Sequence, residues 1–302
     1  MAENACGVPW PRAWAMDNFA ALSGGILRNI VATKSSAENP PSAKPPAKPQ
    51  ARSSLFVGST EKAFQVLEAF NGQHRHMSMA EIARNAELDR SATQRLVYTL
   101  EKLGYLRRIP DSLRYGLSSK VLRLSYHYLR SSDLIERASP YLLDISRSLG
   151  ETANLHELDG HEVVFLARFP GRHLVNIDFA VGYRLPAVFT ASGRAILSKL
   201  DDAQRRAVIA ATPLRPVTAD TETDPQVLLS LVQEAAHKGY SLAMNQTMAG
   251  DIAVAAAITD DQGLPVGAIN VSVPTTRWTV EKAQDQLVAH VLLAATSISK
   301  SR

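Results

Sequence analysis

A helical pattern of apolar and polar positions over residues 78–103 is the clearest local signal in the chain. The segment opens with Ser78-Met79-Ala80-Glu81, a capping box in which each side chain satisfies a free backbone N–H at a helix start. The pattern predicts a short helix, a turn at residues 87–89, and a second helix to about Leu103 with Asp89 as N-cap. The apolar positions of the second helix are expected to be buried: Leu96, Val97, Leu100 and Leu103.

The opposite face of the second helix is polar and carries Arg90, Ser91, Gln94, Arg95 and Tyr98. Two helices with hydrogen-bonding groups on the exposed first turns of the second form the helix-turn-helix arrangement that contacts a DNA major groove. Basic residues outnumber acids strongly over residues 90–108, where Glu101 is the single acid. We therefore expect this face to bind DNA, with Arg suited to guanine and Gln to adenine. Ser78 and Ala92 complete the candidate contacts of the helix pair.

An alternating pattern follows the second helix. Gly104 is expected to end the helix, and residues 105–109 and 113–117 to form a hairpin with a turn at residues 110–112. The hairpin carries Arg107, Arg108 and Arg114, which would suit a wing that contacts phosphates or the minor groove. An ordinary amphipathic helix and a structural hairpin are the alternative, but the ordered set of elements favours DNA binding.

Two further amphipathic segments flank this region. The first is expected to begin at a Ser59 or Thr60 cap and to complete a three-helix core, with these side chains inward: Ala63, Phe64, Val66, Leu67 and Phe70. Residues 120–129 carry a broad apolar stripe, which predicts a linker helix that either forms a dimerisation seam or packs on its own domain. Asp133 is then expected to cap a helix that ends with Leu149 and Gly150.

From residue 152 onward, predicted strands are mixed with helices. The strands are expected at residues 152–158, 162–168, 174–179, 241–244, 252–259 and 265–273. The helices are expected at residues 190–200, 201–211, 225–238 and 279–297, with a loop at 213–224. Helices on a sheet that ends in an antiparallel hairpin indicate an α+β sensor-like domain.

Composition sets limits on these predictions. A chain of 302 residues should form more than one domain, and 45% hydrophobic residues are ample for globular folding. No run of 18 apolar residues occurs, so no membrane association is expected. The formal charge is +3 over residues 1–54, +2 over residues 55–118 and −1 over the remainder, as expected if the front of the chain meets phosphate. Cys6 is the only cysteine, which excludes intrachain disulfides and fits a cytoplasmic protein.

The first 54 residues have the composition of a disordered N-terminal extension. Residues 39–50 read NPPSAKPPAKPQ, a Pro/Ala/Lys linker that should be extended and solvated. We therefore expect four parts: an extension at 1–54, a winged helix-turn-helix domain at 55–118, a linker helix at 119–131 and an effector-binding domain at 132–302.

Three ordered motifs carry a resemblance to a known family. They are RSATQRLVYTLEKLGYL at residues 90–106, GYRLPAVFTASGRAIL at 182–197 and GDIAVAAAITDDQGLPVGAINVSVPTTRW at 250–278. From about residue 55 to its end the chain resembles the IclR family of bacterial transcriptional regulators. The resemblance implies a winged helix-turn-helix followed by a GAF-like α/β effector-binding domain, a homodimer or homotetramer, a pseudo-palindromic double-stranded DNA operator and a small-molecule effector.

The resemblance also implies where the effector would bind. Carried over by position, the candidates are Ala191, Ser192, Gly193, Asn245, Ala253, Asn270 and Ser272. Asn154 and Arg168 are added from the preceding hairpin, since an Arg can pair a carboxylate bidentately, although a surface charge is an equally good reading of Arg168. Backbone N–H groups at Ser192 and Gly193 would suit a carboxylate. The family's usual acidic pair is Asn245-Gln246 here, which removes negative charge and should ease the binding of an anion.

Other chemistry has weaker support. Ser59-Thr60-Glu61-Lys62 matches S-x-x-K, but no partner motif accompanies it. His74 and His76 lack a nearby third ligand, so neither a metal site nor a cofactor is expected. A hydrolase acting at Ser192 is disfavoured because the sequence shows no recognisable order of His and acid around it. A ligand-independent architectural DNA binder is a third hypothesis.

The sequence therefore predicts a DNA-binding transcriptional regulator, not an enzyme, that is modulated by an organic acid and controls a catabolic operon.

Overall fold

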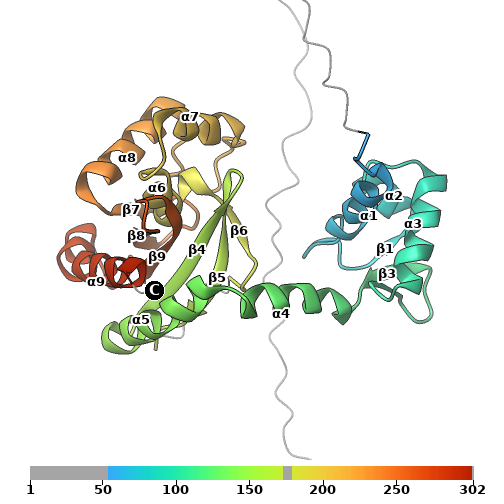
Figure 1. The fold of residues 1–302 in the computed structure, drawn as a ribbon, viewed down its shortest axis with the longest axis horizontal. Helices are drawn as coiled ribbons and strands as arrows, with labels where there is room; N and C mark the ends of the chain where they lie inside the picture. Colours follow the sequence, from blue (N-terminus) through green and yellow to red (C-terminus); the bar gives the residue numbers. More distant parts are fainter. Residues whose placement is uncertain (1–53, 173–178, 301–302) are drawn as a thin grey trace, which may run out of the picture. The chain divides into compact units, whose positions relative to one another are not determined.

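The computed structural model describes residues 54–172 and 179–300 (Figure 1). The predicted extension falls almost entirely on residues 1–53, which lie outside the described residues. Residues 57–117 contain helices α1 (Gly58–Glu68), α2 (Met79–Asn85) and α3 (Arg90–Lys102) and strands β1 (Met77–Ser78), β2 (Leu106–Arg108) and β3 (Arg114–Leu117). Helix α2 begins with the predicted capping box of Ser78 and Glu81, and Asp89 caps α3 by accepting from the Ala92 N–H at 2.8 Å.

A compact apolar core joins the three helices to the hairpin. Val66, Ile82, Val97, Leu100 and Leu106 are among its buried side chains. The predicted three-helix core is therefore present, and the hairpin extends from it as a wing. Strand β1 was not predicted, because it has only two residues, and it pairs with β3 to give the sheet order β1-β3-β2.

Three details of this region differ from the predictions. Helix α1 begins at Gly58 with Val57 as N-cap and no side-chain cap, so neither Ser59 nor Thr60 caps it. Phe64 is 52% exposed because Val66 and Phe70 set the inward face of α1, and Phe64 lies on the other side of the helix. Leu103 is 53% exposed because it is the C-cap of α3, where the chain turns away at Gly104 with φ 78°.

The predicted linker helix is α4 (Leu122–Arg130), preceded by a single 3-10 turn, η1 (Ser119–Val121). None of the residues of α4 is buried, and its exposed apolar side chains are Leu122, Leu124, Tyr126 and Tyr128.

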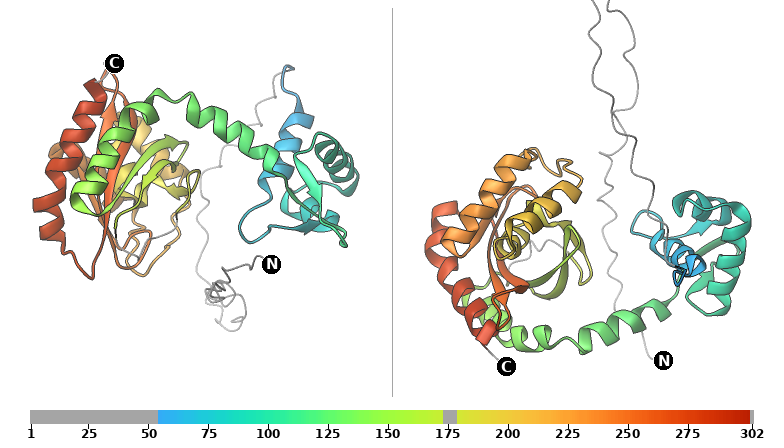
Figure 2. Two further views of the ribbon diagram at one scale, coloured as in Figure 1. Left: turned by 90° about the horizontal axis from the view of Figure 1, so that it is seen from below. Right: turned by 45° about the horizontal axis from the view of Figure 1, so that its top comes forward.

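The C-terminal part is a six-stranded sheet covered by helices on both faces (Figure 2). Its strands are β4 (Thr152–Asp159), β5 (Glu162–Phe169), β6 (Arg184–Pro186), β7 (Ser241–Met244), β8 (Asp251–Thr259) and β9 (Pro265–Pro274). Their order is β6-β5-β4-β9-β8-β7, and every pair among the described residues is antiparallel. The helices are α5 (Asp133–Leu149), α6 (Ala191–Leu197), α7 (Asp202–Ala211), α8 (Pro225–Lys238) and α9 (Val280–Lys300), with a 3-10 turn η2 (Ala187–Phe189).

Alternation along the strands creates two unlike faces. On β8, Ile252, Val254 and Ala256 point into the core beneath α5 and α9. Ala253 and Ala255 point to the other face, which α6 covers. Because Ala side chains are short, α6 can lie close to the sheet there.

The predicted strands and helices of this domain are present with small shifts at their ends, with three exceptions. Ser132, not Asp133, caps α5 by accepting from the Ile135 N–H, because Asp133 is already the first helical residue. Most of the predicted strand at residues 174–179 lies outside the described residues, and Phe179 is not in a strand. The short strand β6 was not predicted.

Candidate functional site

The polar face of α3 is open to solvent. Arg90, Ser91, Gln94, Arg95 and Tyr98 are all exposed, as predicted for side chains that would contact a ligand. A groove between α1 and α3 is lined by Lys62, Arg95 and Thr99, so Lys62 adds a basic group that the sequence reasoning missed.

Two candidate contacts of the helix pair are already occupied. Ala92 is 8% exposed and its N–H is bound by Asp89, so it has no free group to offer. The Ser78 hydroxyl accepts from the Glu81 N–H and donates to the Glu81 carboxylate at 2.8 Å. Ala92 and Ser78 therefore stabilise the starts of α3 and α2, which argues against the predicted contact of these two residues with DNA.

The three arginines of the wing have different surroundings. Arg114 donates to the carbonyl of His76 at 2.7 Å and pairs with Glu81 at 3.3 Å, so it ties β3 to the start of α2. Arg108 donates to the Tyr115 hydroxyl at 3.1 Å. Arg107 lies on the same hairpin and is exposed.

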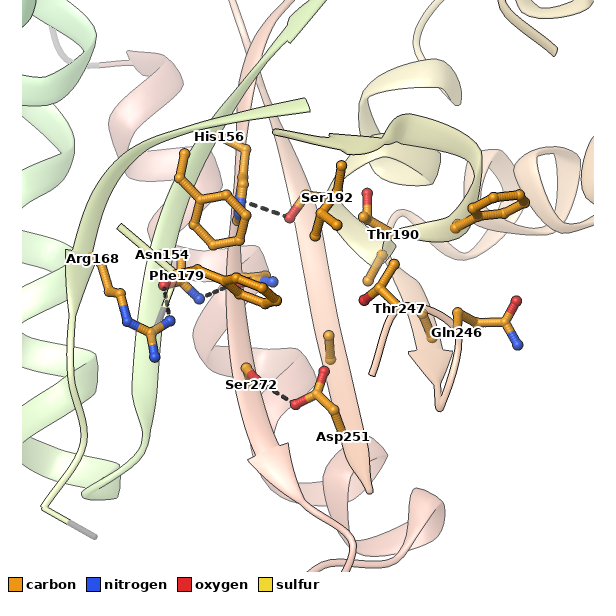
Figure 3. A pocket seen from close by; sticks show the side chains of 17 residues that line it. Asn154, His156, Arg168, Phe179, Thr190, Ser192, Gln246, Thr247, Asp251 and Ser272 are labelled. Atoms are coloured by element: carbon orange, nitrogen blue, oxygen red, sulfur yellow. Dashed lines mark hydrogen bonds between the residues drawn. The ribbon is translucent and has the colours of Figure 1, made fainter. Parts of the chain in front are cut away.

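A small enclosed cavity lies on the sheet face covered by α6 (Figure 3). Its volume is about 40 Å³, and it is lined by Asn154, His156, Phe165, Arg168, Phe179, Leu185, Phe189, Thr190, Ala191, Ser192, Ala243, Gln246, Thr247, Asp251, Ala253, Asn270 and Ser272. Seven of the nine predicted effector-binding residues are in this set. The two that are absent are Gly193 and Asn245.

The middle of the cavity is held by two facing amides. Asn154 Nδ2 donates to Asn270 Oδ1 at 2.7 Å, and Arg168 Nη1 donates to Asn154 Oδ1 at 3.1 Å. Asn154 and Asn270 are both buried, and they are direct partners across β4 and β9. The Asn154 amide therefore fixes the position of the Arg168 guanidinium, which is the one Lys or Arg side chain among the described residues that line the cavity.

A β-bulge brings Arg168 to this face. The β4–β5 pairing shifts between Leu155, which pairs with Ala167, and His156, which pairs with Phe165, so Leu166 is extra. An extra residue reverses the alternation that follows it. Phe165 and Arg168 consequently both face the cavity, although an odd spacing would place them on opposite faces of a regular strand.

One end of the cavity is a neutral polar pair. Ser192 Oγ lies 3.0 Å from His156 Nδ1, and both side chains are buried. Burial, together with the Arg168 charge, lowers the pKa of His156 to about 3, so its imidazole is uncharged at neutral pH. Phe165 packs edge-on to this imidazole at 4.2 Å between ring centroids.

The other end carries a carboxyl group. Ser272 Oγ donates to Asp251 Oδ1, and burial raises the pKa of Asp251 to about 6 even though the Ser272 hydrogen bond and the Arg168 charge both favour its ionised form. Figure 3 shows the Asp251–Ser272 pair and the His156–Ser192 pair at opposite ends of the lining set.

Gly193 and Asn245 have structural roles. The Gly193 N–H is bound by Thr190 Oγ1 at 2.9 Å, so it cannot seat a carboxylate as predicted. Asn245 adopts a φ of 56°, donates to Asp220 at 2.7 Å and accepts from the Gly250 N–H at 2.8 Å, which closes the loop before β8.

Its neighbour Gln246 does line the cavity. Gln246 Oε1 accepts from the buried Arg194 at 3.1 Å, so an uncharged amide occupies this contact of a guanidinium that burial leaves with a lowered pKa of about 10. Arg194 therefore remains charged at neutral pH beside the cavity.

The family models match both parts of the chain. The model for the C-terminal domain of bacterial IclR transcriptional regulators matches residues 126–300, and the IclR helix-turn-helix model matches residues 59–110. The chain belongs to the IclR family of bacterial transcriptional regulators. IclR regulators bind DNA through the helix-turn-helix domain and a small-molecule effector through the C-terminal domain.

Individual relatives agree with this assignment. The Pca regulon regulatory protein of Pseudomonas putida is 34% identical over 242 residues, which are 80% of this chain and 82% of that relative. A transcriptional regulator from Rhodococcus sp. RHA1 has a similar crystal structure, with TM-score 0.69, 29% identity and coverage of 81% of this chain and 98% of that one. An IclR homologue from Microbacterium hydrocarbonoxydans, crystallised with 4-hydroxybenzoate, has TM-score 0.66, 27% identity and coverage of 80% and 97%.

Sequence reasoning missed five polar residues that line this pocket: His156, Thr190, Gln246, Thr247 and Asp251. His156 is two residues from Asn154 on β4, and Asp251 is two residues from Ala253 on β8. Because residues two apart on a strand share a face, this spacing could have placed both His156 and Asp251 on the pocket face. The described residues contain no group of three or more His, Cys, Asp or Glu side chains that could hold a metal. None of the helices in the described ranges is long and apolar enough to span a membrane.

Proposed function

We propose that this IclR regulator binds a small aromatic or related organic acid in the cavity, and that binding changes its affinity for a pseudo-palindromic operator. The observation that carries the proposal is the placement of Arg168 in one cavity with aromatic walls and a neutral Ser192–His156 pair. A guanidinium binds a carboxylate, and Phe165, Phe179 and Phe189 supply apolar surface for a ring.

The strand register supports an elongated ligand. His156 lies opposite Ala268, Asn154 opposite Asn270, and Thr152 opposite Ser272. At about 3.4 Å per residue, the His156 end and the Ser272 end are roughly 14 Å apart along the strands. An acid with a hydroxyl at its far end, such as the 4-hydroxybenzoate bound by the Microbacterium homologue, would place its hydroxyl near Ser192 and its carboxylate near Arg168.

The small volume of the cavity supports a coupling mechanism. About 40 Å³ holds one or two water molecules and not an aromatic ring, so the bound state must differ from this one. A ligand that binds an enlarged state shifts the population toward it by its differential affinity. The two states would then differ in their affinity for the operator.

For the DNA surface, we propose contacts from Arg90, Ser91, Gln94, Arg95 and Tyr98 in the major groove, with Arg107 and Lys62 on phosphates.

The proposed division of the chain is an extension at 1–54, a winged helix-turn-helix at 55–118, a linker helix at 119–131 and an effector domain at 132–302. The two family matches support this division, since the helix-turn-helix match ends at residue 110 and the C-terminal match begins at residue 126.

We further propose a cytoplasmic homodimer or homotetramer that performs no catalytic step and governs a catabolic operon. The exposed apolar side chains of α4 support self-association.

Thermal shift and duplex binding together test the proposed function. A panel of aromatic and aliphatic acids, including 4-hydroxybenzoate, is added to the full-length chain, and affinity is measured for duplexes that the chain itself selects from a random pool. At least one acid should raise the melting temperature and change duplex affinity. Arg168→Gln should remove both effects while the duplex affinity without ligand is retained. A flat panel would favour a ligand-independent architectural binder.

A hydrolase remains the second candidate because one observation favours it. Contrary to the sequence argument, His156 does lie within hydrogen-bond distance of Ser192. Its lowered pKa makes it a weak base, and among the described residues no acid is hydrogen-bonded to it. Turnover of a small ester that Ser192→Ala abolishes would support the hydrolase.

A further inference from the structure

Asp251 is an unusual residue to find in a pocket that should receive an anion. Its carboxyl lines the cavity beside Ser272, while Arg168 lines the same cavity from β5. An ionised Asp251 would repel an incoming carboxylate and compete with it for the same guanidinium. A neutral Asp251 would do neither, and its O–H could donate a hydrogen bond.

We propose that Asp251 is a second anchor for the effector, which as a neutral acid donates a hydrogen bond to the effector carboxylate while Arg168 supplies the positive charge. This inference rests on the proposed function, because it requires an anionic effector in this cavity. The effector class is thereby narrowed to carboxylates, and the binding of one carboxylate is coupled to the binding of one proton.

The proton balance follows from the charges in the cavity. Before binding, the charged or titratable side chains that line the cavity, among the described residues, are Arg168 on β5, Asp251 on β8 and His156 on β4. His156 is neutral. When the effector carboxylate pairs with Arg168, the charge that favours ionised Asp251 is cancelled and a second negative charge is added. One proton from solvent therefore binds Asp251, and no covalent bond forms or breaks.

Groups behind the lining residues do not oppose this step. Arg194 donates to the Gln246 amide at 3.1 Å, and the Asp220 carboxylate accepts from the Asn245 amide at 2.7 Å. The Ser272 hydroxyl can keep its bond to Asp251 in either protonation state, because a protonated carboxyl still has an acceptor oxygen.

The predicted pH dependence has a definite sign. Burial already raises the pKa of Asp251 to about 6, and the bound anion raises it further. Below about pH 6 the carboxyl is protonated before binding and affinity should be flat. Above it, affinity should fall by roughly tenfold for each pH unit until the pKa of the bound state is passed.

Calorimetric titration of the full-length chain with 4-hydroxybenzoate tests this directly. At pH 7.5, heats measured in buffers of different ionisation enthalpy should report the uptake of about one proton per effector bound, because a single group, Asp251, is protonated. Asp251→Asn should show no uptake and should bind with an affinity that does not depend on pH. Asp144→Asn, an exposed acid on α5, is the matched control and should behave as wild type.

Two additional measurements keep the test independent of one variant. Ser272→Ala removes a hydrogen bond that favours ionised Asp251, so the pH at which affinity begins to fall should rise. The neutral analogue 4-hydroxybenzamide, which lacks the carboxylate, should bind more weakly than 4-hydroxybenzoate, and any binding of it should occur without proton uptake.

The failures are distinguishable. Binding of 4-hydroxybenzoate without proton uptake, or with a pH dependence that persists in Asp251→Asn, overturns the role of Asp251 and leaves the proposed function intact. If neither 4-hydroxybenzoate nor any acid of the panel binds at pH 6 or 7.5, the proposed function fails and the role of Asp251 fails with it.

Discussion

Gly193 is fixed by a close approach of two backbone segments. A Cβ built on this residue would lie 2.1 Å from the Ala187 carbonyl oxygen, which belongs to the 3-10 turn η2 before α6. No side chain can be accommodated unless the turn or the helix moves. The glycine of this motif therefore allows α6 to pack on the turn that precedes it.

Gly193→Ala should consequently destabilise the effector domain. We expect a loss of about 1–3 kcal/mol in the free energy of unfolding, the usual cost of forcing extra atoms into a packed site. Denaturant unfolding followed by circular dichroism would measure it. Gly72→Ala is the control, because a Cβ there meets nothing within 4 Å, and its effect should stay within about 0.5 kcal/mol. Equal stabilities for the two variants would contradict the packing argument.

The same carboxyl that we assign to effector binding should reduce stability at high pH. Because the pKa of Asp251 is raised in the folded state, the native chain binds more protons than the unfolded chain between about pH 4 and pH 6. The destabilisation is complete above pH 6 and absent below about pH 4. Asp251→Asn should therefore be more stable than wild type at pH 8, by up to about 3 kcal/mol for a shift of this size.

Urea unfolding of the two proteins at pH 4, 6 and 8 would check this prediction. The difference between them should shrink as the pH falls. A constant difference would mean that the effect of the substitution is steric and not electrostatic.

Sequence could predict the polar pocket residues only as far as regular alternation extends. Asn154, Asn270 and Ser272 follow the period of two, and the structure does place them in one cavity. The hydrogen bond between Ser192 and His156 joins residues 36 positions apart on different elements, so no local pattern contains it. The sequence did not indicate that Asn245 would adopt a φ of 56° and use its amide to bind Asp220 and the Gly250 N–H.

At the level of elements, local chemistry determined most helix starts. The caps Ser78, Asp89, Asp201 and Asp224 all accept from backbone N–H groups of the helix that follows. Gly150 and Gly239 end their helices in the left-handed conformation. The bulge in the β4–β5 pairing was not predictable, because it depends on which residues pair across the hairpin and not on the sequence of one strand.

The wing provides a comparison between two arginines on one element. Arg107 is exposed, whereas Arg114 bridges the His76 carbonyl and the Glu81 carboxylate. Arg107→Ala should weaken binding to all duplexes alike and lower the slope of log affinity against log salt by about 1, with no change in melting temperature.

Arg114→Ala should instead lower the melting temperature of the helix-turn-helix domain, because β3 loses its tie to α2. Fluorescence anisotropy with a labelled duplex at several salt concentrations, and differential scanning calorimetry, would separate the two effects. Identical salt slopes in wild type and Arg107→Ala would exclude Arg107 from phosphate contact.

On the scale of the whole molecule, α4 is the element whose apolar surface the described residues leave uncovered. Leu122 is 64% exposed and Leu124 55% exposed, although both lie between two well-packed domains in the chain. The sequence left open whether this stripe packs on its own domain or forms a seam. Its exposure favours the seam.

Leu124→Glu should therefore shift the assembly toward smaller species, because a buried unpaired carboxylate in a subunit interface is costly. Analytical ultracentrifugation of the full-length chain would show the change. Arg123→Gln, which alters the adjacent position, should leave the distribution of species unchanged. An unaltered sedimentation coefficient for Leu124→Glu would place the interface elsewhere.

The order of the strands has a consequence for how the chain matures. The central pair of the effector-domain sheet joins β4, near the start of that domain, to β9, more than a hundred residues later. A nascent polypeptide can complete its helix-turn-helix while it is still being synthesised, but the sheet stays split until β9 leaves the ribosome. During that interval the nascent regulator has a folded helix-turn-helix domain for binding DNA, but its effector domain is incomplete and cannot bind a metabolite. A chain that ends before residue 265, where β9 begins, would therefore retain the helix-turn-helix domain and lack a complete effector domain.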